Sequence, residues 1–208
     1  MMDKIKVFFK KYYVAFIIVF GAIILDLSTK ILMTNLISFV TNENGKVVSV
    51  DRITVIKDFF YFSYARNTGA GWSLLSNQTW LLIIITLIAL TMFIYMMKEF
   101  DIEKKFFFSF GLSMMIGGTL GNFVERIFHG YVTDFFEFIL FASSPTLHYD
   151  WPIFNVADIC LVVGTISVLV SVLFTKENVF EVKKSALDNR KNNEEKVNEE
   201  VEKEEDNN

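Results

Sequence analysis

Hydrophobic residues along the chain gather in four long runs, each close to the roughly 20 residues that a helix needs to cross a bilayer. The intervening segments hold most of the charged and turn-forming residues. One run is almost wholly apolar, whereas the other three contain polar residues at intervals. This pattern predicts a membrane α-helical fold with four transmembrane helices, at about 12–33, 79–97, 106–124 and 153–174.

Basic residues indicate which way these helices cross the membrane. Lysines cluster before the first run and in the short link between the second and third: Lys4, Lys6, Lys10, Lys11, Lys98, Lys104 and Lys105. By the positive-inside rule, both termini are cytoplasmic, and the loops at about 34–78 and 125–152 face outward. The basic start and apolar middle also suit a signal peptide. No small-residue cleavage site follows, so we expect a retained first helix.

Composition and charge add two constraints. Hydrophobic residues make up 52% of the chain and its mean hydropathy is +0.39, which is typical of a membrane protein. The net charge of −4 arises in residues 175–208, where eleven acids outnumber seven bases. We therefore expect a membrane domain at 1–174 and an acidic, disordered cytoplasmic tail at 175–208. The sequence has no basic patch for nucleic acid, and the single Cys160 supports neither an intrachain disulfide nor a CxxC metal site.

The first outer loop has the composition of β-structure. Residues 47–64 are rich in Val, Ile, Phe and Tyr, and residues 41–46 (TNENGK) suit a turn. The following Asn-Thr-Gly-Ala-Gly at 67–71 favours a tight turn with a close backbone approach. A small β-structure on the outer membrane face is predicted.

Polar residues within the apolar runs are the candidate chemistry. Asp26 and Lys30 lie four residues apart on one helical face, where an ion pair lowers the cost of burying either charge. This pair either positions the first helix or contacts substrate. The third run carries polar and glycine residues on one side, and the glycines allow a neighbouring helix to approach closely: Gly111, Gly118, Asn122, Glu125 and Arg126. Glu125 and Arg126 either join helix ends or belong to a site, where Arg126 can hold a carboxylate.

Two carboxylates from separate segments are expected at one membrane depth. Pro152 suits a first helical turn, which places Asn155 and Asp158 on one face near the outer surface. Asp134 follows the third run on the same side. Such a pair suits aspartyl hydrolysis, with one ionised general base and one protonated acid, and the helix N-terminus favours the charge on Asp158. A solvated helix end is the alternative interpretation of each carboxylate.

Read together, "DLSTK" (26–30), "NTGAGWS" (67–73), "GGTLGNFVERIFHGYVTDF" (117–135) and "FNVAD" (154–158) resemble the motif set of bacterial lipoprotein signal peptidase, signal peptidase II. The resemblance covers about residues 12–174. It implies a four-helix intramembrane aspartyl endopeptidase with a small extracytoplasmic β-cradle. It also implies a multi-pass protein of the bacterial cytoplasmic membrane, with its active site toward the outer face.

The resemblance also implies the substrate and the residues that act on it. The substrates are prolipoproteins, cut just before a diacylglyceryl-modified cysteine, and membrane lipid is the other partner. No metal or organic cofactor is expected, and we expect a monomer. The implied catalytic residues are Asp134 and Asp158; the implied supporting residues are Asp26, Lys30, Asn67, Gly69, Gly118, Asn122, Glu125, Arg126 and Asn155.

Departures from the family pattern leave alternatives open. Glu125 stands where the family has Asp, which puts the local ion-pair geometry in doubt, and Gly71-Trp72 replaces the usual small-aromatic pair. A small channel or transporter also places carboxylates near helix ends, although more naturally near the midplane. A non-enzymatic scaffold explains the β-loop and tail but not the two aspartates. A catalytically inactive relative is the remaining alternative.

Overall fold

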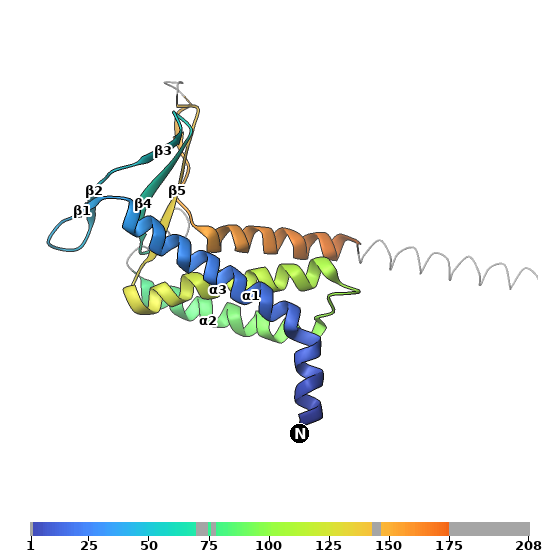
Figure 1. Ribbon diagram of the computed structural model, residues 1–208. Helices are drawn as coiled ribbons and strands as arrows, with labels where there is room; N and C mark the ends of the chain where they lie inside the picture. Colours follow the sequence, from blue (N-terminus) through green and yellow to red (C-terminus); the bar gives the residue numbers. More distant parts are fainter. Residues whose placement is uncertain (1, 70–74, 76–77, 143–146, 175–208) are drawn as a thin grey trace, which may run out of the picture. The chain divides into compact units, whose positions relative to one another are not determined.

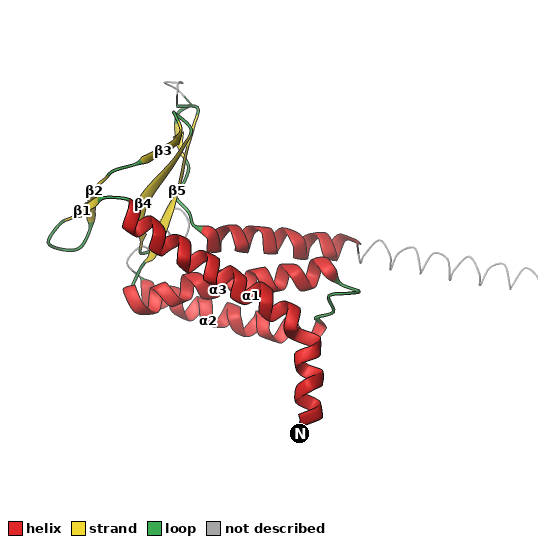
Figure 2. Cartoon of the chain, viewed as in Figure 1, coloured by secondary structure: helices red, strands yellow, loops and turns green. Residues whose placement is uncertain are grey.

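The computed structural model describes residues 2–69, 75, 78–142 and 147–174. Four helices in this part of the chain are long and apolar enough to cross a membrane, as the sequence predicts (Figures 1 and 2). They are α1 (Met2–Leu36), α2 (Thr79–Met96), α3 (Phe106–His129) and a fourth helix, Val156–Phe174. The short 3₁₀ helix η2 (Met97–Glu99) follows α2. The predicted tail at 175–208 and the Gly71-Trp72 pair lie outside the described residues.

Two helix boundaries differ from the sequence expectation. α3 continues past 124 to His129 and ends at Gly130, whose φ of 76° is a left-handed conformation that glycine adopts without strain. The fourth helix begins at Val156, so Pro152 lies before the helix and not in its first turn. These two boundaries place Glu125 within a helix and Asp158 in a first turn.

Glycines on α3 allow two neighbouring helices to come close. A Cβ atom at Gly118 would lie 2.5 Å from the carbonyl oxygen of Ala157, in the fourth helix. On another side of α3, a Cβ at Gly121 would lie 2.5 Å from a carboxylate oxygen of Asp26 in α1. A larger residue at Gly118 would push the fourth helix away from α3, and one at Gly121 would displace the Asp26 side chain. The close packing expected at the α3 glycines is therefore present.

The strands form two antiparallel sheets. β1 (Phe39–Thr41) and β2 (Val47–Val50) make a hairpin, whose turn includes Gly45 with a φ of 73°. The second sheet has the order β3-β4-β5-β6, formed by Ile53–Ile56, Phe60–Asn67, Val132–Leu140 and Tyr149–Asp150. The strands and the turn predicted in the first outer loop are thus present.

β5 was not expected, because residues 125–152 were assigned as an outer loop from the positions of the apolar runs and the basic residues. Its partner in the sheet is β4, and the register places Asp134 opposite Ala65 and Val132 opposite Asn67. In Figure 1, β4 and β5 rise from the ends of α1 and α3 and continue away from these helices. The pairing fixes Asp134 near the end of α3, where the helices meet the sheet.

Candidate active site

The carboxylates of Asp134 and Asp158 line one cavity of about 290 Å³. Asp134 belongs to β5, and Asp158 is the third residue of the fourth helix. Polar side chains from β4, α3 and the start of the fourth helix surround the pair. Those that line the cavity are Asn67, Asn122, Arg126 and Asn155.

Asp158 is fixed by the N-terminus of its own helix. Asn155 accepts a hydrogen bond at Oδ1 from the main-chain N–H of Asp158, at 3.1 Å. In return, the main-chain N–H of Asn155 donates to Oδ2 of Asp158, also at 3.1 Å. This reciprocal arrangement is a capping box, with Asn155 as the N-cap. The helix N-terminus and the N–H of Asn155 together stabilise negative charge at Asp158.

Asp134 is almost completely buried and lies between two amides. Its Oδ1 accepts a hydrogen bond from Asn155 Nδ2 at 2.6 Å, and its Oδ2 accepts one from Asn67 Nδ2 at 2.9 Å. Burial, followed by the nearby charge of Asp158, raises the pKa of Asp134 to about 7. Asp134 is thus able to hold a proton near neutral pH, whereas an ordinary aspartate is ionised there.

Asn122 and Lys30 connect the two carboxylates from behind. Asn122 donates from Nδ2 to Asp158 Oδ1 at 2.9 Å, and its own Oδ1 accepts from Lys30 Nζ at 2.8 Å and from Asn155 Nδ2 at 3.1 Å. Since Lys30 fixes the orientation of the Asn122 amide, the donor end of that amide must point to Asp158. Lys30 is 2% exposed, so its charge needs partners.

The partners of Lys30 are two buried carboxylates, and neither lines the 290 Å³ cavity. Lys30 Nζ lies 2.8 Å from Asp26 Oδ2 and 3.0 Å from Glu125 Oε2. Asp26 also accepts a hydrogen bond from the main-chain N–H of Ala157 at 2.9 Å. Of the two roles left open for Asp26 and Lys30, the geometry therefore supports positioning, because α1 is tied directly to the first turn of the fourth helix.

Glu125 has a specific task in this arrangement. Its two oxygens accept hydrogen bonds from the Thr133 main-chain N–H at 2.9 Å and from the Thr133 hydroxyl at 2.8 Å. Thr133 precedes Asp134 in β5. The longer side chain at 125 therefore spans from Lys30 to the strand that carries Asp134, and the ion pair that was in doubt is formed.

Arg126 contacts a carbonyl group of the loop after β4. Its Nη2 donates to the Gly69 carbonyl oxygen at 3.1 Å, and the Gly69 N–H donates to Asn67 Oδ1 at 2.9 Å. Arg126 forms no ion pair with a carboxylate in the described part of the chain, and its buried Nε has no hydrogen-bond partner there. Arg126 and Gly69 thus orient the Asn67 amide toward Asp134.

The site residues predicted from the sequence either line the cavity or support the residues that line it. Six line the 290 Å³ cavity: Asn67, Asn122, Arg126, Asp134, Asn155 and Asp158. Asp26, Lys30 and Glu125 support them from behind, Gly118 sets the approach of the fourth helix, and Gly69 orients Asn67. Thr133 and the N–H of Ala157 were missed. No spacing rule identifies Thr133, because it acts through a strand that the sequence did not predict.

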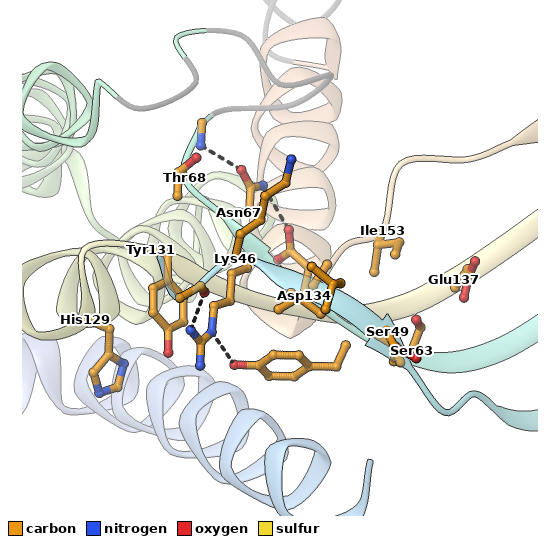
Figure 3. Close-up of a pocket in the computed structure, with 18 of the residues that line it drawn as sticks. Lys46, Ser49, Ser63, Asn67, Thr68, His129, Tyr131, Asp134, Glu137 and Ile153 are labelled. Carbon is orange, nitrogen blue, oxygen red and sulfur yellow. Dashed lines mark hydrogen bonds between the residues drawn. The ribbon is translucent and has the colours of Figure 1, made fainter. Parts of the chain in front are cut away.

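A second, larger cavity of about 1300 Å³ shares Asp134 with the first. Figure 3 shows Asn67 beside Asp134, with Glu137, Ser63 and Ser49 at another part of its wall. Arg66 closes one side of it: the guanidinium donates to the Gly45 carbonyl oxygen at 2.8 Å and to the Tyr64 hydroxyl at 3.1 Å. The β1–β2 hairpin is thereby attached to β4 next to the carboxylates.

The described residues were also compared with the arrangements of side chains that hold metal ions. Within 2–69, 75, 78–142 and 147–174, no group of three or more His, Cys, Asp or Glu side chains is arranged to hold a metal ion. Lys30 already occupies the position between Asp26 and Glu125 that a cation would take.

The family model and the relatives that match this chain all carry the same description. Residues 18–174 match the family model described as signal peptidase (SPase) II. A protein of Bacillus pumilus named lipoprotein signal peptidase is 34% identical over 167 residues, which cover 78% of this chain and 97% of that protein. A Listeria monocytogenes protein of the same name is 40% identical over 121 residues, or 58% of this chain and 74% of that protein.

Solved structures with the same fold also match. One described as a bacterial membrane enzyme has a TM-score of 0.65 and 30% sequence identity, and the match covers 79% of this chain and 90% of the other. A second of the same description has a TM-score of 0.62 at 30% identity, over 77% of this chain and 93% of the other.

Proposed function

Because this chain belongs to the signal peptidase II family, aspartic proteases that remove signal peptides from prolipoproteins, we propose that Asp134 and Asp158 perform the hydrolysis. The observation that carries the proposal is the shared cavity, in which the two carboxylates are held by Asn155, Asn122 and Asn67. An aspartyl mechanism needs two carboxylates with different protonation states at one site.

Each carboxylate has its own role in the proposed reaction. Asp158 is the general base: it takes a proton from a water molecule, whose oxygen attacks the carbonyl carbon of the scissile peptide bond. Protonated Asp134 donates to the carbonyl oxygen as negative charge develops there. When the tetrahedral intermediate collapses, the C–N bond breaks, Asp158 gives the proton it took from water to the leaving amine of the cysteine, and the former carbonyl oxygen returns its proton to Asp134. The asymmetry agrees with the N–H donors around Asp158 and the raised pKa of Asp134.

The lipid part of the substrate is proposed to enter from the apolar side of the same cavity. Apolar side chains complete the wall of this cavity: Val132, Trp151, Pro152, Ile153, Phe154 and Val162. Burial of acyl chains against such a surface contributes about 0.8 kcal/mol per CH₂ group. We therefore propose that the scissile bond precedes a diacylglyceryl-modified cysteine, and that water reaches it from the polar side.

The proposed location follows from charge and topology. Lysines at the start of α1 and between α2 and α3 favour a cytoplasmic position for those ends. The carboxylates lie at the opposite helix ends, so we place them at the outer face of the bacterial cytoplasmic membrane. We propose a monomer as the active unit, since Asp134 and Asp158 line one cavity within a single chain.

The test uses the purified full chain in detergent and a prolipoprotein with or without its diacylglyceryl group. Wild type is expected to cleave only the lipidated form, and Asp134→Asn and Asp158→Asn are each expected to lose at least about 10³-fold in kcat, because each removes one proton-transfer group. Asp150→Asn is the matched control, since this carboxylate lies on the exposed strand β6. An active Asn variant would refute the assignment of the pair, and an inactive wild type would support the inactive-relative alternative.

A further inference from the structure

An ion pair on the wall of the larger cavity has no role in the proposed hydrolysis. Arg52, just before β3, donates from Nη2 to Glu137 Oε1 at 2.8 Å. Glu137 lies on β5, three residues after Asp134, and both line the 1300 Å³ cavity. The Arg52 side chain is 51% exposed and that of Glu137 only 6%, so the pair joins a buried anion to an accessible cation.

The burial of Glu137 makes sense as a means of holding Arg52. A buried carboxylate is costly unless it has partners, and Glu137 Oε2 has none in the described part of the chain. Arg52 also lies over the ring of Tyr61, 5.8 Å from its centroid, and Tyr61 is the residue opposite Glu137 in the sheet. The guanidinium is therefore fixed from two sides, while Nε and Nη1 make no hydrogen bond to a described residue. A planar guanidinium held this way is suited to bind an acceptor.

The cavity wall around Arg52 favours an anion. Three basic side chains, Lys46, Arg52 and Arg66, line it against two acids, Asp134 and Glu137. Arg66 is already engaged with Gly45 and Tyr64. Glu137 compensates much of the charge of Arg52 but does not occupy its other donors. An incoming carboxylate thus meets available N–H groups and a net positive wall.

The direction of β5 indicates which part of the substrate reaches Arg52 and Glu137. The strand leaves the helices at Val132 and continues away from them toward Leu140 (Figure 1). We place the apolar segment of the signal peptide among the apolar helices, so that the chain beyond the scissile bond follows the direction from Asp134 to Glu137. Three residues of strand span about 10 Å, and an extended substrate covers the same distance in about three residues. The third residue of the mature chain would then lie at Arg52.

We propose that Arg52 is a specificity-determining residue that binds an acidic side chain at about the third position after the scissile bond, and that Glu137 is the positioning residue that holds its guanidinium. This inference rests on the proposed peptidase function and adds a preference on the mature side of the cleavage site. It concerns binding of substrate, not the chemical step.

The test compares three lipidated prolipoproteins that differ only at the third mature residue, which is Asp, Asn or Lys. Wild type is expected to cleave the Asp form with a kcat/KM about tenfold above that of the Lys form. This ratio is expected to arise from a lower KM for the Asp form, and its size is that of one hydrogen bond to a charged group. In Arg52→Gln, the ratio falls to about one while kcat for the Asn form is retained. Glu137→Gln lowers the ratio in part. Lys57→Gln, an exposed lysine between β3 and β4, leaves it unchanged.

The possible failures are distinguishable. If wild type cleaves all three forms equally, or if Arg52→Gln keeps the tenfold ratio, the inference is wrong and the proposed function stands. If Lys46→Gln abolishes the ratio and Arg52→Gln does not, the acidic group binds at the hairpin and the assignment to Arg52 is wrong. If wild type cleaves none of the lipidated forms, the proposed function fails together with the inference. Arg52→Lys, which keeps charge without the planar fork, is expected to lie between wild type and Arg52→Gln.

Discussion

Asp26 in α1 accepts a hydrogen bond from the main-chain N–H of Ala157, the residue that precedes Asp158 in the fourth helix. The distance is 2.9 Å, and both residues are fully buried. Since the same carboxylate pairs with Lys30, one side chain of α1 fixes both the helix of Asp158 and the cation behind Asn122.

This relationship predicts a graded effect of substitutions at Asp26. Asp26→Asn keeps an oxygen for the Ala157 N–H but loses the charge that faces Lys30, whereas Asp26→Ala loses both. We expect the alanine variant to be destabilised by about 3–5 kcal/mol, because it leaves a buried lysine with one partner fewer, and the asparagine variant by less. Thermal unfolding in detergent checks the order. Equal destabilisation by both variants would contradict the role of the Ala157 contact.

Gly118 offers a test of helix spacing. In Gly118→Ala the new methyl group would lie 2.5 Å from the Ala157 carbonyl oxygen and 3.0 Å from Cys160 Cβ. The fourth helix must shift, at a cost of about 1–3 kcal/mol for overpacking. Because a displacement of about 1 Å costs up to about 10²-fold in rate, kcat is expected to fall by about that factor. Gly21→Ala is the matched control in α1: no atom lies within 4 Å of its new methyl group, and activity should be unchanged.

The raised pKa of Asp134 predicts how activity depends on pH. If Asp134 must be protonated in the free enzyme, kcat/KM falls as pH rises through about 7. Measurement of kcat/KM between about pH 5 and about pH 9 gives the midpoint of this decrease. A profile that is flat through pH 8 would show that Asp134 does not act as an acid.

Stability has a related pH dependence. A buried carboxyl group whose pKa is raised in the folded state holds its proton there after the unfolded chain has released it, so the free energy of unfolding decreases as pH rises from about 4 to about 7. The expected slope is on the order of 1.4 kcal/mol per pH unit. Asp134→Asn lacks this ionisation, so its stability relative to wild type should increase over the same interval. Thermal melts at several pH values compare the two.

Glu125 is predicted to tolerate glutamine better than alanine. Its Oε2 accepts from Lys30 and from the Thr133 N–H, and its Oε1 accepts from the Thr133 hydroxyl and lies 3.9 Å from His129 Nδ1. In Glu125→Gln the hydroxyl can rotate and accept from the new amide, so only the charge is lost. Glu125→Ala removes every one of these contacts and should cost about 3–5 kcal/mol. Thermal unfolding midpoints of the two variants in detergent test this difference. Similar midpoints would contradict the proposed hydroxyl rotation.

Much of this architecture follows from local sequence. The apolar runs predicted the helices because a bilayer requires long uninterrupted hydrophobic stretches. The β-branched and aromatic residues at 47–64 predicted strands, since such side chains favour extended backbone. Asp134 and Asp158 were expected at one depth from helix topology.

The remaining features depend on contacts between distant segments. β5 pairs with β4, about seventy residues earlier in sequence, and no turn signal connects them. Thr133 could not be identified without that pairing. The start of the fourth helix was predictable in principle: Asn155 and Asp158 have the spacing of a capping box, which argues against a first helical turn at Pro152.

The buried charges of α1 also affect how the protein enters the membrane. An aspartate or a lysine near the centre of an isolated helix costs about 2.5–3.5 kcal/mol on insertion scales, and α1 carries Asp26 and Lys30 in its hydrophobic span. Their partners, Asn122, Glu125 and the Ala157 N–H, are synthesised roughly ninety or more residues later. Early in synthesis the two charges have only each other for compensation. The remaining partners of these two charges are supplied only by the third and fourth helices.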